Sequence, residues 1–325
     1  MALVKIVISV FNNSEIKALI HQERTDGMLI LTSFAHQQEM FEKFMRILSN
    51  INLPPFLKHK IAWLIIPIIH ESDYWRAEHI FLTEDVNIDL QSYLRWRSSG
   101  MIDWKKTAEN LVQTQKLDVT KRFLLSCLYC LKDYVFAIWN EMSAIQKESI
   151  IQDKEFSVVE HWVRWLKHGT EINWSRILRN YIASNHQFFH ETPLSLSCFA
   201  QELTPGERQE YFRHHIRNSA VCNDDLLVYL HQVEPNERLN MFREHAYHIL
   251  FLHLEWPNQE RFMYVVNSMW GYLREDEFLY LFLYLTARQQ QMRRDFDYSK
   301  LAQEFWQESP DHLKEFVRNA LLPRP

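Results

Sequence analysis

Residues 202–208 read ELTPGER and residues 232–238 read QVEPNER, so one short phrase occurs twice. A looser copy, ESPD, occupies residues 308–311, and residues 141–147 read EMSAIQK. Each phrase places a residue that can cap a helix just before the expected first turn, usually followed by proline. Proline is favoured at the first helical position because the N–H that it lacks has no partner there. The phrases therefore predict repeated helix starts, which are typical of an all-α fold.

Two of these phrases also fit the reciprocal capping box. In this motif a Ser or Thr side chain bonds the backbone N–H three residues on, and the Glu or Gln at that position bonds back. Thr204 with Glu207 and Ser143 with Gln146 have the required residue types and spacing. A second phrase predicts an Asp or Asn cap followed by an aromatic residue at the first helical position. It reads IDWK at 102–105, INWS at 172–175 and FDYS at 296–299.

The composition favours a helical globular protein. The chain has 325 residues, of which 47% are hydrophobic and 14% aromatic, enough for a large core or for two domains. Only five residues are glycine, where average usage of about 7% would give roughly twenty. Nucleotide-binding α/β folds need glycine where the backbone approaches phosphate. The shortage therefore disfavours those folds, as well as barrels and sandwiches with glycine-rich turns.

Charge and cysteine content limit the partners and the compartment. The formal net charge is −5, so no strong basic field attracts nucleic acid or an anionic membrane, and both are disfavoured. Four cysteines in 325 residues do not form a disulfide scaffold, which predicts a reducing, cytoplasmic location. The apolar N-terminus is short and interrupted by Lys5, so no signal peptide is expected. A membrane span needs about 20 apolar residues, and the runs Ile61–Ile69 and Phe278–Leu285 are far shorter. We expect both runs to be buried core.

Helical periodicity is clearest in residues 122–142, which we expect to form one helix. Its apolar positions recur at gaps of three and four residues and so lie on one face: Leu124, Cys127, Leu128, Leu131, Val135, Ile138, Trp139 and Met142. Ser143 would start the next helix at once, which predicts antiparallel neighbours. Tryptophans on such stripes, including Trp139, Trp162 and Trp306, are expected in the core.

These patterns predict an irregular array of antiparallel helix pairs, resembling an α-solenoid, with an irregular all-α globule as the alternative. The proline-based phrases lie 30 residues apart (235 − 205) and then 75 (310 − 235), so the repeat is not regular. We expect residues 36–325 to form one domain and residues 1–35 a small mixed or helical N-terminal cap. Residues 4–10 and 28–32 fit either short strands or buried helix, because runs of this length show no decisive period.

One segment resembles a known family. Residues 127–133, CLYCLKD, followed by Trp139, resemble a phrase in highly diverged ankyrin-like helical repeat proteins of arthropods. The resemblance covers about one repeat and consists mostly of hydrophobic spacing. The ankyrin signature TPLH is absent, and residues 192–195, TPLS, match it only in part. The resemblance implies an interaction scaffold and no catalytic residues.

The cysteines and histidines supply candidate metal ligands. Cys127 and Cys130 have the spacing of half a zinc site or a redox pair, but Cys198 and Cys222 do not form a second pair. Cysteines at this spacing inside a helix are typical of core packing.

Two histidine pairs have spacings at which both rings could share a helix face: His186 with His190, four apart, and His245 with His248, three apart. Glu191 and Glu244 could add carboxylate ligands. No HExxH motif is present, so ordinary surface or core histidines are the preferred interpretation and no cofactor is expected.

The sequence favours a protein-binding function without catalysis. It contains no GxSxG, P-loop or GxGxxG motif, so no catalytic residue is predicted. We expect a protein–protein interaction scaffold whose partner is not identified. One alternative is a helical-repeat RNA-binding protein using the basic side chains Arg288, Arg293, Arg294 and Lys300, although acidic residues interrupt that stretch. The other is an all-α metal-dependent enzyme built on the histidine pairs.

Overall fold

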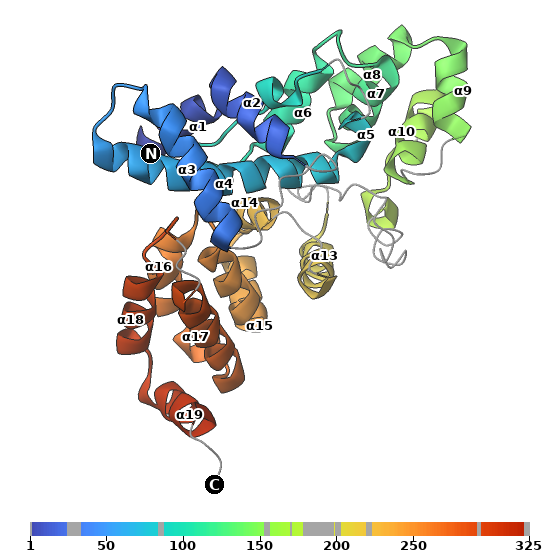
Figure 1. Ribbon diagram of the computed structural model, residues 1–325. Coiled ribbons are helices and arrows are strands. Elements are labelled where there is room, and N and C mark those ends of the chain that lie inside the picture. Colours follow the sequence, from blue (N-terminus) through green and yellow to red (C-terminus); the bar gives the residue numbers. More distant parts are fainter. Residues whose placement is uncertain are drawn as a thin grey trace. The chain divides into compact units, whose positions relative to one another are not determined.

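The computed structural model describes residues 2–24, 34–83, 88–152, 157–169, 171–177, 198, 203–218, 223–290 and 294–321. Every regular element among these residues is a helix, as Figure 1 shows, so the predicted all-α class is confirmed. Strand-like pairing in these ranges is limited to one antiparallel bridge between Trp96 and Ile102.

The chain divides into two compact units. The first contains residues 1–73, 98–101 and 235–325, and the second contains residues 74–97 and 102–234. The expected division into a cap of residues 1–35 and one array stays a prediction.

The first unit contains the N-terminal and C-terminal helices. They are α1 Ala2–Phe11, α2 Ser14–Glu23, α3 Phe34–Ser49, most of α4 Pro55–Glu78, α15 Pro235–Leu254, η3 Gln259–Arg261, α16 Phe262–Asn267, η4 Trp270–Tyr272, α17 Glu275–Gln290, α18 Tyr298–Glu308 and α19 Asp311–Leu321. The second unit contains the last turn of α4 and the middle of the chain. Its helices are α5 Ile80–Thr83, η1 Leu90–Tyr93, α6 Trp104–Val112, α7 Val119–Leu128, α8 Lys132–Glu141, α9 Ala144–Gln152, α10 Ser157–His168, α13 Pro205–Asn218 and α14 Asn223–Gln232.

The N-terminal residues are helical rather than extended where the structure describes them. α1 covers residues 2–11 and buries Val7, Val10 and Phe11. Asn13 begins α2, because its side-chain oxygen accepts the backbone N–H of Glu15 at 2.9 Å. Residues 28–32, the other candidate strand, lie outside the described ranges.

Both predicted capping boxes are confirmed. Thr204 Oγ1 accepts the Glu207 N–H at 3.4 Å, and the Glu207 carboxylate accepts the Thr204 N–H at 3.0 Å. Ser143 Oγ accepts the Gln146 N–H at 3.3 Å, and Gln146 Oε1 accepts the Ser143 N–H at 2.9 Å. The helices that follow, α13 and α9, begin where these boxes predict.

The second phrase also marks helix starts in all three copies. In each copy an Asp or Asn side chain accepts the backbone N–H three residues on, at 2.9–3.1 Å: Asp103 from Lys106, Asn173 from Arg176, and Asp297 from Lys300. These residues bind local backbone groups, so local sequence alone decides where the helices begin.

The predicted single helix over residues 122–142 is wrong, because α7 ends at Leu128 and α8 begins at Lys132. Cys130 adopts a left-handed backbone with φ of 53°. The Leu131 N–H bonds the Ser126 carbonyl at 2.9 Å, and the Cys130 N–H bonds the Cys127 carbonyl at 3.3 Å. This pair of bonds is the Schellman motif that closes a helix. The apolar spacing continues through the break because α7 and α8 pack against each other as a hairpin.

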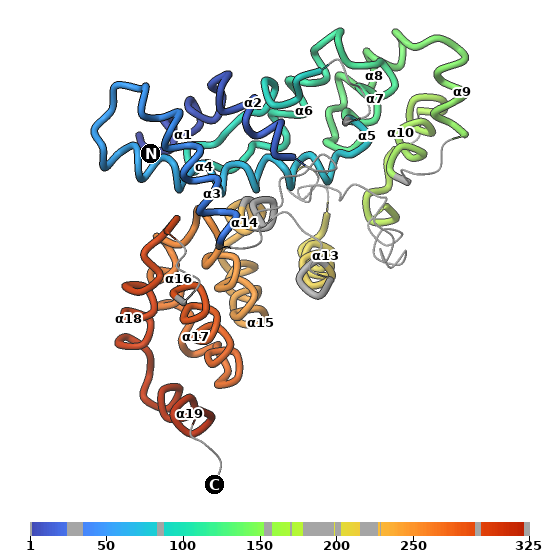
Figure 2. The backbone as a smooth tube through the Cα atoms, viewed as in Figure 1, coloured from blue at the N-terminus to red at the C-terminus, as the bar shows by residue number. Residues whose placement is uncertain are grey.

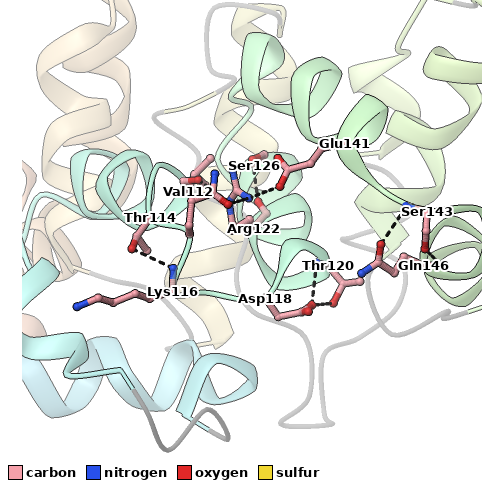
Figure 3. Close-up of polar contacts among 11 residues, drawn as sticks. Val112, Thr114, Lys116, Asp118, Thr120, Arg122, Ser126, Glu141, Ser143 and Gln146 are labelled. Carbon is pink, nitrogen blue, oxygen red and sulfur yellow. Dashed lines mark hydrogen bonds and ion pairs between the residues drawn. The ribbon is translucent and has the colours of Figure 1, made fainter.

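A buried arginine joins three helices of the second unit (Figure 3). Arg122 on α7 donates from Nε to the Val112 carbonyl at the end of α6, at 2.8 Å. Its Nη1 donates to Glu141 at the end of α8, at 2.9 Å, and to Gln115 at 3.3 Å. The guanidinium therefore satisfies a carbonyl that α6 leaves unpaired at its C-terminus, and this fixes α6 and α8 against α7.

A histidine lies at the centre of the second unit's aromatic core. His79 is fully buried, with Nδ1 2.7 Å from the Trp75 carbonyl and Nε2 2.7 Å from the Tyr129 hydroxyl. Because a carbonyl only accepts, Nδ1 carries the proton and Nε2 accepts from Tyr129. The ring stacks on Trp75 with centroids 4.3 Å apart and meets Trp104 edge-on at 5.3 Å. Burial lowers the pKa of His79 from 6.5 to about 4, so the imidazole is neutral.

The run Ile61–Ile69 lies in α4 and is core, as the sequence predicts. Ile61, Ile65, Ile68 and Ile69 have no exposed surface, and most of their neighbours in the run are buried as well. In the described part of the chain, no helix is both long enough and apolar enough to cross a membrane.

Candidate protein-binding surface

α17 has more apolar faces than the first unit covers. Its residues 278–285 read FLYLFLYL, and a helix that is apolar on all sides is normally buried. Phe278, Leu281 and Leu285 are fully buried, but Tyr280 is 60% exposed and Leu283 is 40% exposed. The prediction that the whole run is core is therefore wrong for one face of the helix. Among the described residues, the neighbouring elements cover one side of α17 and leave the opposite side open.

α15 lies beside α17 (Figure 2). It extends this open face with further rings. The Tyr247 and Phe251 rings of α15 have centroids 6.1 Å apart, and Phe251 lies 4.8 Å from the Tyr284 ring of α17. These three rings are half-buried. Tyr280 lies three residues before Leu283 and four before Tyr284, and residues at these spacings are neighbours on a helix surface. We call this surface, formed by Tyr247, Phe251, Tyr280, Leu283 and Tyr284, the α15–α17 aromatic strip.

An arginine closes the strip near the C-terminus of α17. Arg288 Nη2 lies 2.7 Å from the carboxylate of Glu255, the residue after α15, and its guanidinium lies 4.7 Å from the centre of the Tyr284 ring. Tyr284 also donates its hydroxyl to Glu255. Burial and the Glu255 charge raise the pKa of Tyr284, so its hydroxyl stays protonated. This end of the strip therefore combines a tyrosine ring, a carboxylate and a guanidinium from the same chain.

The other end of the strip, at the N-terminus of α17, is acidic. Arg274 bonds both Asp276 at 3.2 Å and Glu277 at 3.2 Å, so two carboxylates share one guanidinium. Burial raises the pKa of Tyr247, and the nearby Glu277 and Tyr280 raise it further. Glu277 and Tyr280 therefore both lie near the Tyr247 hydroxyl. The first turn of α17 carries three carboxylates, Glu275, Asp276 and Glu277, against the one guanidinium of Arg274.

Other exposed apolar side chains are more isolated. Tyr264 on α16 is 85% exposed, while Phe136 and Ile145 of the second unit are 58% and 83% exposed. Single apolar side chains on a surface are normal and need no special explanation. The strip differs because it joins several rings with an exposed leucine on two adjacent helices.

The basic candidates do not form one surface in the part of the chain that the structure describes. Arg288 is engaged with Glu255, and Lys300 Nζ lies 3.6 Å from Glu304. Arg294 is exposed, and Arg293 lies outside the described residues. The aspartates and tyrosines of this stretch are occupied too: Tyr298 donates its hydroxyl to Asp295 at 3.1 Å and accepts a bond from Gln259 at 3.1 Å.

The histidine candidates are only partly described. His186, His190 and Glu191 lie outside the described residues. The rings of His245 and His248 are 6.4 Å apart, and His245 Nε2 lies 3.8 Å from Glu244. The backbone at His245 is not helical (φ −133°, ψ 29°), so the two rings do not have the spacing of a regular helix face. Burial lowers the pKa of His248. Among the residues with described positions, no group of three or more potential ligands could hold a metal ion.

The CxxC pair lies at the end of α7, not inside a helix as expected. Cys127 is buried, and burial raises the pKa of its thiol well above the ordinary value. A redox cysteine instead needs a lowered pKa. The Cys127 carbonyl accepts a 3.0 Å bond from the indole of Trp162, so this residue contributes to packing between α7 and α10. The segment CLYCLKD, which carries the resemblance to ankyrin-like repeats, spans this helix end and the start of α8.

Comparisons with protein-family models, curated proteins and solved structures give no match. The candidate surface therefore rests on the residues and geometry of this chain.

Sequence reasoning missed the strip because it treated FLYLFLYL as core. The run itself contained a signal, because its apolar residues follow neither one helical stripe nor alternation. A helix that is apolar all round needs partners on every side. The two exposed positions mark the side where the chain supplies none in the part that the structure describes.

Proposed function

We propose that this protein is a non-catalytic protein–protein interaction scaffold that binds its partner on the α15–α17 aromatic strip. The observation that carries the proposal is the 60% exposed Tyr280 beside the 40% exposed Leu283 on a helix whose opposite face is core. Tyrosine and other aromatic residues are enriched at protein interfaces, where they bury a large apolar area and keep a polar group. An exposed set of such residues on packed helices suits recognition of another protein.

The helical architecture supports the same proposal. An array of helix pairs offers extended surfaces for binding, and we propose that the confirmed helix starts belong to an irregular array of this type. The resemblance of residues 127–133 to diverged ankyrin-like repeats also suggests a scaffold. Cys127 is a free, buried thiol, and it supports our proposal of a reducing, cytoplasmic location.

The test is affinity purification of the tagged protein from native cells, with and without RNase. We expect a stoichiometric protein partner that survives RNase treatment. Recovery dominated by RNA, with proteins lost after RNase, would overturn the scaffold and favour RNA binding through Arg294 and its neighbours.

A matched pair of variants links the partner to the surface. Leu283→Asn should release the partner, because it places an amide in the apolar strip. Tyr264→Ala should retain it, because Tyr264 is 85% exposed, more than Leu283, but is not part of the strip. Retention by both variants would show that the partner binds elsewhere on the chain.

A further inference from the structure

The chemistry of the strip also indicates what kind of protein segment it binds, on the basis of the proposed scaffold function. At its C-terminal end, the strip shows one complete arrangement. The Arg288 guanidinium lies 4.7 Å from the Tyr284 ring centre while its Nη2 lies 2.7 Å from the Glu255 carboxylate. Arginine suits this arrangement because its planar group stacks on a ring and bonds a carboxylate at the same time.

The N-terminal end of the strip repeats the ring and the carboxylates around a more exposed tyrosine. Asp276 lies one helical turn before Tyr280 and is 54% exposed, and Glu277 lies near Tyr247 and three residues before Tyr280 on the same helix. Their shared partner Arg274 is bonded to both carboxylates through its side chain. In the part of the chain that the structure describes, no basic side chain lies over the Tyr280 ring.

We propose that the strip binds a partner segment carrying an arginine next to a large apolar residue. The arginine stacks on Tyr280 and points its charge toward Asp276 and Glu277, as Arg288 does toward Glu255 at the other end. The apolar residue packs on Leu283 and on the half-buried rings beside it. The excess carboxylate at this end supplies the charge complementarity, and the exposed ring supplies the contact area.

The same evidence argues against the other occupants of an open helix face. A nucleic acid would place phosphates against Asp276 and Glu277, and like charges at close range are unfavourable. A second copy that paired strip against strip would present Arg288, which is already bound to Glu255.

The test is selection of short random peptides displayed on phage against the full-length protein. Peptides that also bind a Tyr280→Ala variant are removed in each round. We expect the remaining pool to be enriched in arginine next to leucine or an aromatic residue. The best peptide should bind about tenfold more weakly to Tyr280→Ala than to the natural protein. Binding should weaken with added salt, because the contact is charged and exposed.

Three controls make the result decisive. Tyr264→Ala should bind the peptide as the natural protein does, and circular dichroism should show that all variants are folded. Asp276→Asn should weaken binding several-fold while keeping the exposed ring. Replacing the peptide's arginine by glutamate should abolish binding.

Several outcomes would overturn this inference. A pool without excess arginine, or one that binds Tyr280→Ala equally well, would do so. Self-association seen by sedimentation and abolished by Tyr280→Ala would also overturn the inference, because a second copy of this chain would then occupy the strip. If the native partner survives RNase but is insensitive to Tyr280→Ala, the scaffold function stands and only the surface assignment fails. If no protein partner is recovered, the scaffold function itself fails.

Discussion

The apolar runs Ile61–Ile69 in α4 and Phe278–Leu285 in α17 look alike as sequences but differ in what surrounds them. In α4, Ile61, Ile65 and Ile68 have no exposed surface. In α17, Tyr280 and Leu283 remain exposed while the opposite face is fully buried. An apolar run therefore shows that a helix needs partners, and the tertiary structure decides whether its own chain supplies them on every side.

The largest difference should appear when asparagine replaces an apolar residue in each run. Ile65→Asn creates a cavity and buries an amide, so we expect a loss of about 4–7 kcal/mol, enough to unfold a typical domain. Leu283→Asn should change stability by less than about 1 kcal/mol, mostly through helix propensity. Urea unfolding followed by circular dichroism measures both. Similar losses for the two variants would show that the face of α17 is covered after all.

A second test extends the comparison to two tryptophans of the second unit. Trp162 is 2% exposed and donates to the Cys127 carbonyl at 3.0 Å, so Trp162→Ala should cost about 3–5 kcal/mol. Trp139, which the sequence placed in the core, is half-buried, with Lys147 5.4 Å from its ring centre. We therefore expect only about 1–2 kcal/mol for Trp139→Ala. Equal thermal shifts would contradict this difference in burial.

A third test uses pH to compare the ends of the two helices. His79 follows α4 as a buried neutral ring, whereas the end of α17 carries the charged pair Arg288–Glu255. The unfolded state binds a proton at His79 below pH 6.5, but the folded state does so only below about 4. Stability therefore falls as the pH decreases through this window, by about 3 kcal/mol between about pH 7 and pH 4.

The control for the pH test is His79→Gln, which removes the titrating ring. Carboxylates that titrate in the same range affect both chains equally, so the difference between their unfolding midpoints isolates His79. The natural protein should lose more stability than the variant as the pH decreases. Parallel pH profiles would exclude a buried neutral histidine.

The smallest effect concerns a helix start, where coverage by other elements should not matter. Thr204→Ala removes the hydroxyl that accepts the Glu207 N–H, and we expect a loss of about 1 kcal/mol. Thr204→Ser keeps the hydroxyl and should stay close to the natural protein. Thermal unfolding followed by circular dichroism measures the change for the whole protein, and hydrogen exchange of the α13 amides measures it locally. No difference between the Ala and Ser variants would contradict the capping box.

The sequence by itself determined the helix starts and the all-α class. Thr204, Ser143 and Asp103 bind backbone groups within three residues, so the information needed for these caps is local. The shortage of glycine is also read from the sequence alone, and it disfavours folds that depend on tight glycine turns. Neither the caps nor the composition depends on which distant parts of the chain pack together.

Only the tertiary structure decided where α7 ends, which partners hold Arg288 and His79, and which face of α17 stays open. Cys130 takes a left-handed backbone although its neighbours keep a helical spacing, because α7 and α8 pack together across that turn. Arg288 bonds Glu255, which lies 33 residues earlier, and His79 bonds Tyr129, which lies 50 residues later. Burial depends on elements far apart in sequence, and apolar residues have the same pattern whether their partner belongs to this chain or to another protein.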